Sequence, residues 1–123
     1  MKIFLERTFS AAHCLRDEGL SPAENEKYFG KCENLHGHTW RVQFEVEGQV
    51  DFKSGMVVNF NTLKESIDRF DHGLVNDIVK LPTAEHLVMY FMKELKSMEL
   101  FSYVRVRVYE SEKAYAEKEW SSK

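Results

Sequence analysis

The chain has 123 residues, of which 43% are hydrophobic and 30% charged, with a formal net charge of −3 and a pI near 6.0. These values are typical of one soluble domain, so we expect residues 1–123 to form a single domain around one core. The slightly acidic balance argues against a nucleic-acid partner and an anionic membrane surface, and no apolar run approaches the roughly 20 residues that cross a bilayer.

The N-terminal segment MKIFLERTF lacks the apolar core and the cleavage site of a signal peptide. The chain has only two cysteines, Cys14 and Cys32. We therefore expect a cytoplasmic protein in which both thiols are free.

Two long strands are predicted in the first half by alternation of apolar and polar residues. The first runs from Lys2 to His13, and the second and clearer one from His36 to Glu47, where His36 and His38 continue the apolar face. The intervening residues 16–31 are polar and contain Gly and Pro, which predicts a long loop with a helical turn at 22–28. Loops of this length in compact domains are more often functional than idle.

Two helices and further strands are predicted in the second half. A turn at 51–55 and a short strand from Met56 to Phe60 precede a helix that Asn61 could cap, with an apolar stripe at Leu63, Ile67 and Phe70. Thr83 could cap the second helix, in which leucine or phenylalanine recurs every four residues at 87, 91 and 95.

The last clear strand runs from Tyr103 to Glu110, with valines on one face, and residues 116–120 could add an edge strand. This order of elements predicts an α+β fold, a small antiparallel sheet with two helices packed on one face.

The histidines of the HGH motif suggest a metal centre. His36 and His38 point the same way from one strand, about 7 Å apart. His13 ends another strand with matching parity, so it is the best third ligand. Three histidines with an open fourth position are typical of catalytic zinc rather than structural zinc. The alternative is a pair of ordinary histidines at a strand edge.

Cys32 precedes His36 by four residues. As a fourth metal ligand it would close the site and make it structural. Away from the metal, beside Lys31, it would be a thiolate able to act as a base or nucleophile. A buried and inert cysteine is the third possibility.

Two acidic positions also suggest chemistry. Asp71 can orient His72 and form a proton-transfer pair, although a solvated pair at a helix end is equally compatible with the spacing. Glu110 continues the valine face, where an unpaired carboxylate is costly, so it is protonated, exposed at the strand end, or paired. A ligand with two parallel N–H donors, such as an aminopyrimidinone edge, would satisfy it.

Six motifs in order resemble the 6-pyruvoyltetrahydropterin synthase and 6-carboxytetrahydropterin synthase family over nearly the whole chain. They are FSAAHCL (9–15), C-x3-HGH (32–38), GMVVNFNTLK (55–64), FDHGLVND (70–77), PTAEHL (82–87) and VYES (108–111).

The resemblance implies the tunnelling fold, with a four-stranded antiparallel sheet and two helices per subunit. It also implies a homohexamer built as a dimer of trimers, with active sites between subunits. Zn²⁺ would be held by His13, His36 and His38, with Cys32 as general base. Asp71 and His72 would form a proton relay, which a neighbouring subunit could supply. Glu110, with backbone groups near Thr83, would anchor the pterin ring of 7,8-dihydroneopterin triphosphate.

The spacing of three residues between Cys32 and His36 resembles the bacterial 6-carboxytetrahydropterin synthases of queuosine biosynthesis, whereas the pyruvoyl branch carries a longer spacing. We therefore expect a zinc-dependent lyase of the carboxy branch, with the pyruvoyl activity as the alternative. A non-catalytic, zinc-stabilised pterin-binding module, in which Cys32 completes the metal site, is a second alternative. A generic zinc hydrolase is disfavoured because no HExxH motif is present.

Three positions depart from the family pattern. Cys14 replaces a frequent Arg, Asn59 a frequent Asp, and His86 a frequent Asn, so the contacts made by those residues are in question here. By strand parity, Cys14 should point away from His13.

Overall fold

The computed structural model describes residues 1–122, which contain one five-stranded sheet in the order β3-β1-β2-β4-β5. The strands are β1 (Lys2–His13), β2 (His36–Gly48), β3 (Gly73–Leu74), β4 (Phe101–Ser111) and β5 (Ala114–Ser121). The helices are α1 (Pro22–Phe29), α2 (Phe60–Asp68) and α3 (Ala84–Ser97), with short 3₁₀ turns η1 (Gly30–Glu33) and η2 (Val75–Asp77).

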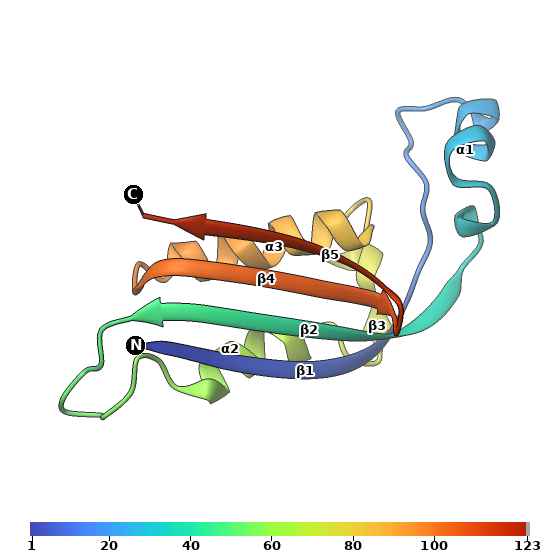
Figure 1. Cartoon of the computed structure of the whole chain (residues 1–123). Helices are drawn as coiled ribbons and strands as arrows, with labels where there is room; N and C mark the ends of the chain where they lie inside the picture. Colours follow the sequence, from blue (N-terminus) through green and yellow to red (C-terminus); the bar gives the residue numbers. More distant parts are fainter. Residues whose placement is uncertain (123) are drawn as a thin grey trace.

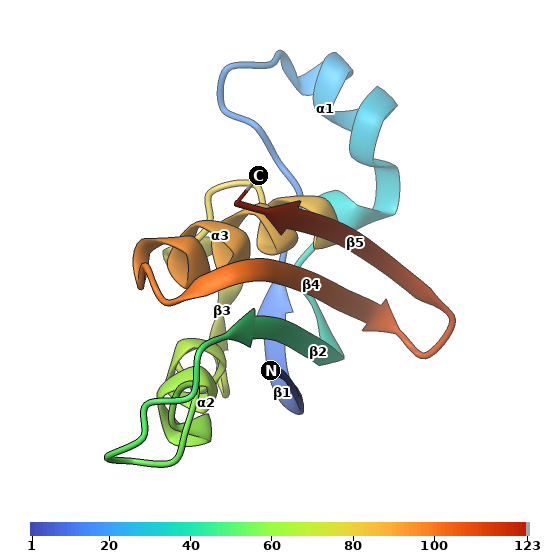
Figure 2. The same cartoon turned by 60° about the vertical axis from the view of Figure 1, so that its left-hand side comes forward.

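Helices α2 and α3 cover one face of the sheet, as Figures 1 and 2 show from two sides. This confirms the predicted α+β class. The four long strands pair antiparallel, as expected. The two-residue strand β3 pairs parallel to β1, so the sheet has five strands rather than four. A strand this short carries no alternating pattern from which it could have been predicted.

The core lies between the sheet and these two helices. Strands β2 and β4 bury every second residue, and the predicted apolar stripes of both helices are buried with them. The fully buried members include Trp40, Val42, Phe44, Leu63, Ile67, Leu87, Phe91, Leu95, Val104, Val106 and Val108. The alternation of β2 thus fixes which face its histidines share.

The segment before α2 differs from the prediction. Residues 56–60 do not form a strand; a single bridge joins Asp51 and Met56, and Phe60 already begins the helix. Val57 is buried without being part of a strand, which explains the misleading apolar run. The N-cap is Asn59 rather than Asn61, because the Asn59 side chain accepts a hydrogen bond of 2.8 Å from the Asn61 N–H.

Helix α1 lies on the long excursion between β1 and β2, beyond the end of the sheet (Figure 1). Ser21 and Glu24 form a reciprocal capping box at its start. The buried Asn25 side chain accepts from the Asp17 N–H and donates to the Asp17 carbonyl. These bonds give the excursion a defined shape and confirm the helical turn predicted there.

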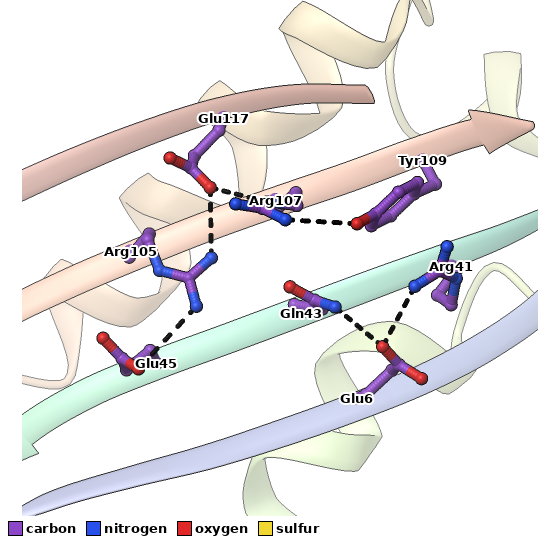
Figure 3. Close-up of polar contacts among 8 residues, drawn as sticks. All are labelled: Glu6, Arg41, Gln43, Glu45, Arg105, Arg107, Tyr109 and Glu117. Atoms are coloured by element: carbon purple, nitrogen blue, oxygen red, sulfur yellow. Dashed lines mark hydrogen bonds and ion pairs between the residues drawn. The ribbon is translucent and has the colours of Figure 1, made fainter. Parts of the chain in front are cut away.

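The sheet face away from the helices carries a network of charged residues (Figure 3). Glu6 accepts hydrogen bonds from Gln43 and Arg41 at 2.8 and 3.2 Å, while Glu117 accepts from Arg107 at 2.6 Å and from Arg105 at 3.1 Å. No segment of residues 1–122 covers this face in Figures 1 and 2. Within the same residues, no helix is long and apolar enough to span a membrane.

Candidate active site

Three histidines meet where β1 ends and β2 begins. The register of the two strands places His13 directly opposite His36, and His38 follows on the same face of β2. One possible ligand atom from each of the three residues lies within 4.8 Å of the others. The side chains predicted from parity to converge are therefore brought together by strand pairing.

Two backbone carbonyls set the orientation of the imidazoles. His13 donates from Nδ1 to the Pro82 carbonyl at 2.8 Å, and His36 donates from Nδ1 to the Asn34 carbonyl at 2.6 Å. Because a carbonyl only accepts, each Nδ1 carries the proton when the ring is neutral, and each Nε2 keeps a free lone pair. Carbonyl partners of this kind orient metal-binding histidines in proteins.

The Nε2 atoms of His13 and His38 are buried and have no hydrogen-bond partner within residues 1–122. A buried polar atom without a partner is costly, which points to a group that the site is built to bind. Imidazole nitrogens suit zinc and related divalent transition metals. The chemistry of these three side chains therefore fits a metal ion.

Burial lowers the pKa of His13, the repulsion of His36 and His38 adds to this effect, and the Pro82 carbonyl partly opposes it. His13 is consequently neutral at physiological pH. A neutral imidazole is the form that binds a metal, so the environment prepares this residue for ligation.

Trp40 forms one wall of the histidine cluster. Its ring packs edge-on against His13 and His38, with centroid distances of 4.9 and 5.4 Å. Its Nε1 donates to the Ala11 carbonyl at 3.3 Å, and the side chain is fully buried. The indole thus holds two imidazoles in place and excludes water from one side.

Glu110 lies beside this cluster at the end of β4. Its Oε2 is 3.9 Å from His13 Nε2, and its side chain is 36% exposed. Glu110 also lines a pocket of about 240 Å³ with Thr83 and Glu85 from the start of α3, and Tyr115 from β5. The sequence left open whether Glu110 is protonated, exposed at the strand end, or paired. In the structure its carboxylate is partly exposed at the end of β4 and faces both the histidines and a pocket.

Cys32 is exposed on η1. Its carbonyl accepts a hydrogen bond of 2.7 Å from the N–H of Leu15, a residue that also lines the Glu110 pocket. Its thiol does not belong to the group of gathered ligand atoms within the described residues. The gathered ligand atoms of the described residues therefore come from three histidines and include no cysteine sulfur.

Asp71 and His72 form a hydrogen-bonded pair just after α2. His72 Nδ1 lies 2.8 Å from Asp71 Oδ2, and Asp71 Oδ1 accepts from the Ser10 N–H at 2.9 Å. The Ser10 bond, followed by the His72 bond, lowers the pKa of Asp71. His72 is 83% exposed and lines, with His38, a hollow of about 440 Å³. An ionised carboxylate thus orients an imidazole that solvent or another molecule can reach.

Of the three positions that depart from the family pattern, Cys14 and His86 are not among the gathered ligand atoms of the described residues. Cys14 and His86 line a separate cleft of about 730 Å³ with Arg16 and Lys80. The Cys14 backbone is held on both sides by the Asn76 side chain. His86 donates from Nδ1 to the Leu81 carbonyl at 2.7 Å, while Asn59 caps α2.

Several supporting groups of the site could not be predicted from the sequence. The carbonyls of Asn34 and Pro82 act through the backbone, so no side-chain pattern could reveal them. Trp40 lies on the same alternating apolar face of β2 as His36 and His38. Its contact with the histidines could have been found only from the same parity that groups it with His38.

The chain belongs to the 6-pyruvoyl tetrahydropterin synthase family, because the model of that family matches residues 2–120. This confirms the resemblance found in the sequence motifs. A Drosophila melanogaster protein named 6-pyruvoyl tetrahydrobiopterin synthase is 39% identical, with 84% of this chain and 72% of that protein covered. An Archaeoglobus fulgidus protein named "Putative 6-carboxy-5,6,7,8-tetrahydropterin synthase" is 36% identical, with 95% and 94% covered.

The solved structure of Caenorhabditis elegans 6-pyruvoyl tetrahydropterin synthase superposes with a TM-score of 0.76 at 32% identity. It covers 98% of this chain and 96% of that one. This likeness confirms the tunnelling fold.

Proposed function

We propose that this chain is a zinc-dependent 6-carboxy-5,6,7,8-tetrahydropterin synthase. It would convert 7,8-dihydroneopterin triphosphate and one water molecule into 6-carboxytetrahydropterin, acetaldehyde and triphosphate for the biosynthesis of queuosine. The observation that carries the proposal is the histidine cluster, in which two buried Nε2 atoms lack partners within residues 1–122 and a carboxylate-lined pocket lies alongside.

His13, His36 and His38 would hold the ion. When bound, zinc supplies Lewis-acid polarisation of the substrate's side-chain hydroxyls. The lowered pKa of His13, the carbonyl-fixed tautomers of His13 and His36, and the packing of Trp40, which excludes water from one side, support this role.

Glu110 would accept two parallel N–H bonds from the aminopyrimidinone edge of the pterin ring. The first backbone N–H groups of α3, near Thr83, would help to place the same ring, since both lie along one pocket. Recognition of a planar edge by a carboxylate gives orientation as well as affinity.

Cys32 would act as general base through its thiolate, and Asp71 with His72 would deliver or accept the second proton. General acid–base steps are each worth about 10²–10⁴ in rate. The His72 side chain is exposed on the surface of this chain. The Asp71–His72 pair would therefore reach the active site of a neighbouring subunit and act on the substrate bound there. Loss of triphosphate and rearrangement of the side chain would follow.

The carboxy branch is favoured by the three-residue spacing between Cys32 and His36. The near-complete mutual coverage with the Archaeoglobus fulgidus protein supports the same branch. The pyruvoyl activity is the second candidate, favoured by the 39% identity to the Drosophila melanogaster protein.

One incubation separates these candidates. Purified protein is mixed with 7,8-dihydroneopterin triphosphate, and the products are identified by mass spectrometry. Acetaldehyde with a carboxypterin supports the proposal. A pyruvoyl pterin assigns the chain to the other branch. Substrate that binds to the zinc-loaded protein and stays unchanged would instead support the non-catalytic pterin-binding module.

We further propose that residues 1–123 act as one cytoplasmic domain that assembles into a hexamer, a dimer of trimers with sites between subunits. The charged, uncovered sheet face supports assembly around a polar channel. The partner of this assembly would be a small pterin triphosphate, with neither nucleic acid nor membrane involved.

A further inference from the structure

A pocket between α3 and β5 is surrounded by positive charge. Helix α3 runs along β4 and β5 on the covered face of the sheet (Figures 1 and 2), and the pocket has a volume of about 430 Å³. Its lining residues are Met89, Met92, Lys93, Lys96, Ser97 and Lys118. Three lysines from two elements thus face one hollow, and within the described chain no acidic side chain lines it. The pocket shares no residue with the candidate active site.

The two lysines of α3 lie on one side of the helix. Lys93 and Lys96 are three residues apart, a spacing that makes side chains neighbours on the helix surface. Glu94 follows Lys93 in the chain, but its carboxylate is paired with Arg69 at 3.2 Å. The Lys96 ammonium lies 4.9 Å from the centroid of the Trp120 ring, a contact that holds it beside β5. Helix α3 therefore contributes two positive charges and no negative charge to the hollow.

Lys118 interrupts the apolar, helix-facing side of β5. It lies opposite Val106, a fully buried residue of β4, and shares its face with the partly buried Trp120. The adjacent Glu117 points to the other face of the sheet, where it accepts hydrogen bonds from two arginines of β4. Within residues 1–122, none of the three lysines of the pocket lies within 4.0 Å of a carboxylate oxygen. The positive charge of the hollow is therefore not neutralised by the chain itself.

The charge and the floor of the pocket define the ligand that it fits. Like charges around one hollow repel each other, and a bound anion removes this repulsion. Lysine binds phosphate groups as a flexible point charge. Met92 is buried in the floor, while Met89 is exposed and offers an adaptable apolar surface. The hollow therefore suits a small molecule that carries several phosphate charges, with room for an attached ring. The net charge of −3 for the whole chain argues against a nucleic-acid polymer.

We propose that the pocket bounded by Lys93, Lys96 and Lys118 binds an oligophosphate at a site separate from the active site. This chemistry is common to a free triphosphate and to the phosphate chain of a nucleoside triphosphate. In the second case, the base would lie against the Met89 side chain. Binding there is independent of the proposed reaction, because none of these residues takes part in it.

Isothermal titration calorimetry on the zinc-loaded protein tests this binding, with inorganic triphosphate in one titration and ATP in another. We expect binding to the wild type, and affinities about tenfold weaker or more in Lys118→Gln, because a charge-assisted contact is lost. The double variant Lys93→Gln/Lys96→Gln should weaken binding further. Tighter binding of ATP identifies a nucleoside triphosphate as the ligand, whereas equal or tighter binding of triphosphate identifies the phosphate chain alone. Zinc content is measured before and after each titration, so that removal of metal by the probe is recognised.

Lys53→Gln is the matched control, because Lys53 lies in the turn before α2, carries the same charge and does not line the pocket. Its affinities for both probes should equal those of the wild type, and circular dichroism checks the fold of every variant. Equal losses in Lys53→Gln and Lys118→Gln would assign the effect to overall charge and overturn the proposal. Wild-type affinity in Lys118→Gln and in the double variant, or no binding of either probe to the wild type, would also overturn it.

Discussion

His13 is the most constrained of the three clustered histidines. Its ring is fully buried, packs edge-on against Trp40, and donates to the Pro82 carbonyl. That His36 and His38 share a face followed from strand periodicity alone. The approach of His13 depends on the register that pairs it with His36, and no side chain in either strand marks that register in the sequence.

At the same scale, Cys32 has a role that can be separated from metal binding. In Cys32→Ala we expect full zinc content and a wild-type circular dichroism spectrum, because the thiol is exposed and not among the gathered ligand atoms of the described chain. Turnover should fall by about 10²–10⁴ through loss of the general base. Metal analysis and a product assay on the same sample check both parts; retained turnover would remove Cys32 from the mechanism.

Asp71 should affect turnover through His72. In Asp71→Asn, the side-chain oxygen can still accept from the Ser10 N–H, so the fold at pH 7 should survive. The amide no longer provides the carboxylate that orients His72 Nδ1, and turnover should fall about 100-fold or more. Steady-state kinetics test this expectation, and a wild-type rate would contradict the relay.

The same variant has an expected effect on acid stability. The pKa of Asp71 is lowered in the folded protein, so its stabilisation is present above the ordinary value of about 3.9 and is lost as the pH falls through the lowered folded value. Asp71→Asn should therefore show less loss of stability below about pH 4. Thermal melts between neutral and acidic pH measure the difference.

Among the elements, the long strands and both covering helices could be predicted because each repeats one period over many residues. Strand β2 alternates throughout, and α3 buries Leu87, Phe91 and Leu95 on one stripe. The segment 56–60 could not be predicted correctly, because Val57 is buried from irregular backbone. Its apolar residues face the core without forming the hydrogen bonds of a strand. Hydrophobic periodicity cannot distinguish such an irregular buried segment from a strand.

Helix α3 begins beside the candidate pterin pocket, and Thr83 fixes its first turn. The Thr83 hydroxyl accepts a hydrogen bond of 3.1 Å from the His86 N–H. Replacement by alanine should cost about 1 kcal/mol of unfolding free energy and lower the melting temperature by about 4 °C. Thr83→Ser keeps the hydroxyl and serves as control; equal losses in both variants would show that the cap is not the cause.

For the whole molecule, the sheet face away from the helices is charged, and no segment of residues 1–122 covers it (Figures 2 and 3). Strand β5 forms one edge of this sheet. At the other edge, the two-residue strand β3 pairs with only two residues of the long strand β1. Edges of this kind can pair with another chain. The sequence implied assembly only through its family motifs, since no pattern in one chain encodes a ring.

Light scattering coupled to size exclusion tests the assembly. Six chains of 14.5 kDa should elute as one particle of about 87 kDa. A particle of 14.5 kDa at working concentrations would contradict the shared active site.

The most direct test of the account is the coordination of the metal in the purified, substrate-free protein, measured by elemental analysis and zinc X-ray absorption. We predict one zinc ion per chain, bound by three imidazole nitrogens and one oxygen at about 2.0–2.1 Å. A protein that takes up no zinc, or a sulfur ligand at about 2.3 Å, would contradict a centre built from His13, His36 and His38.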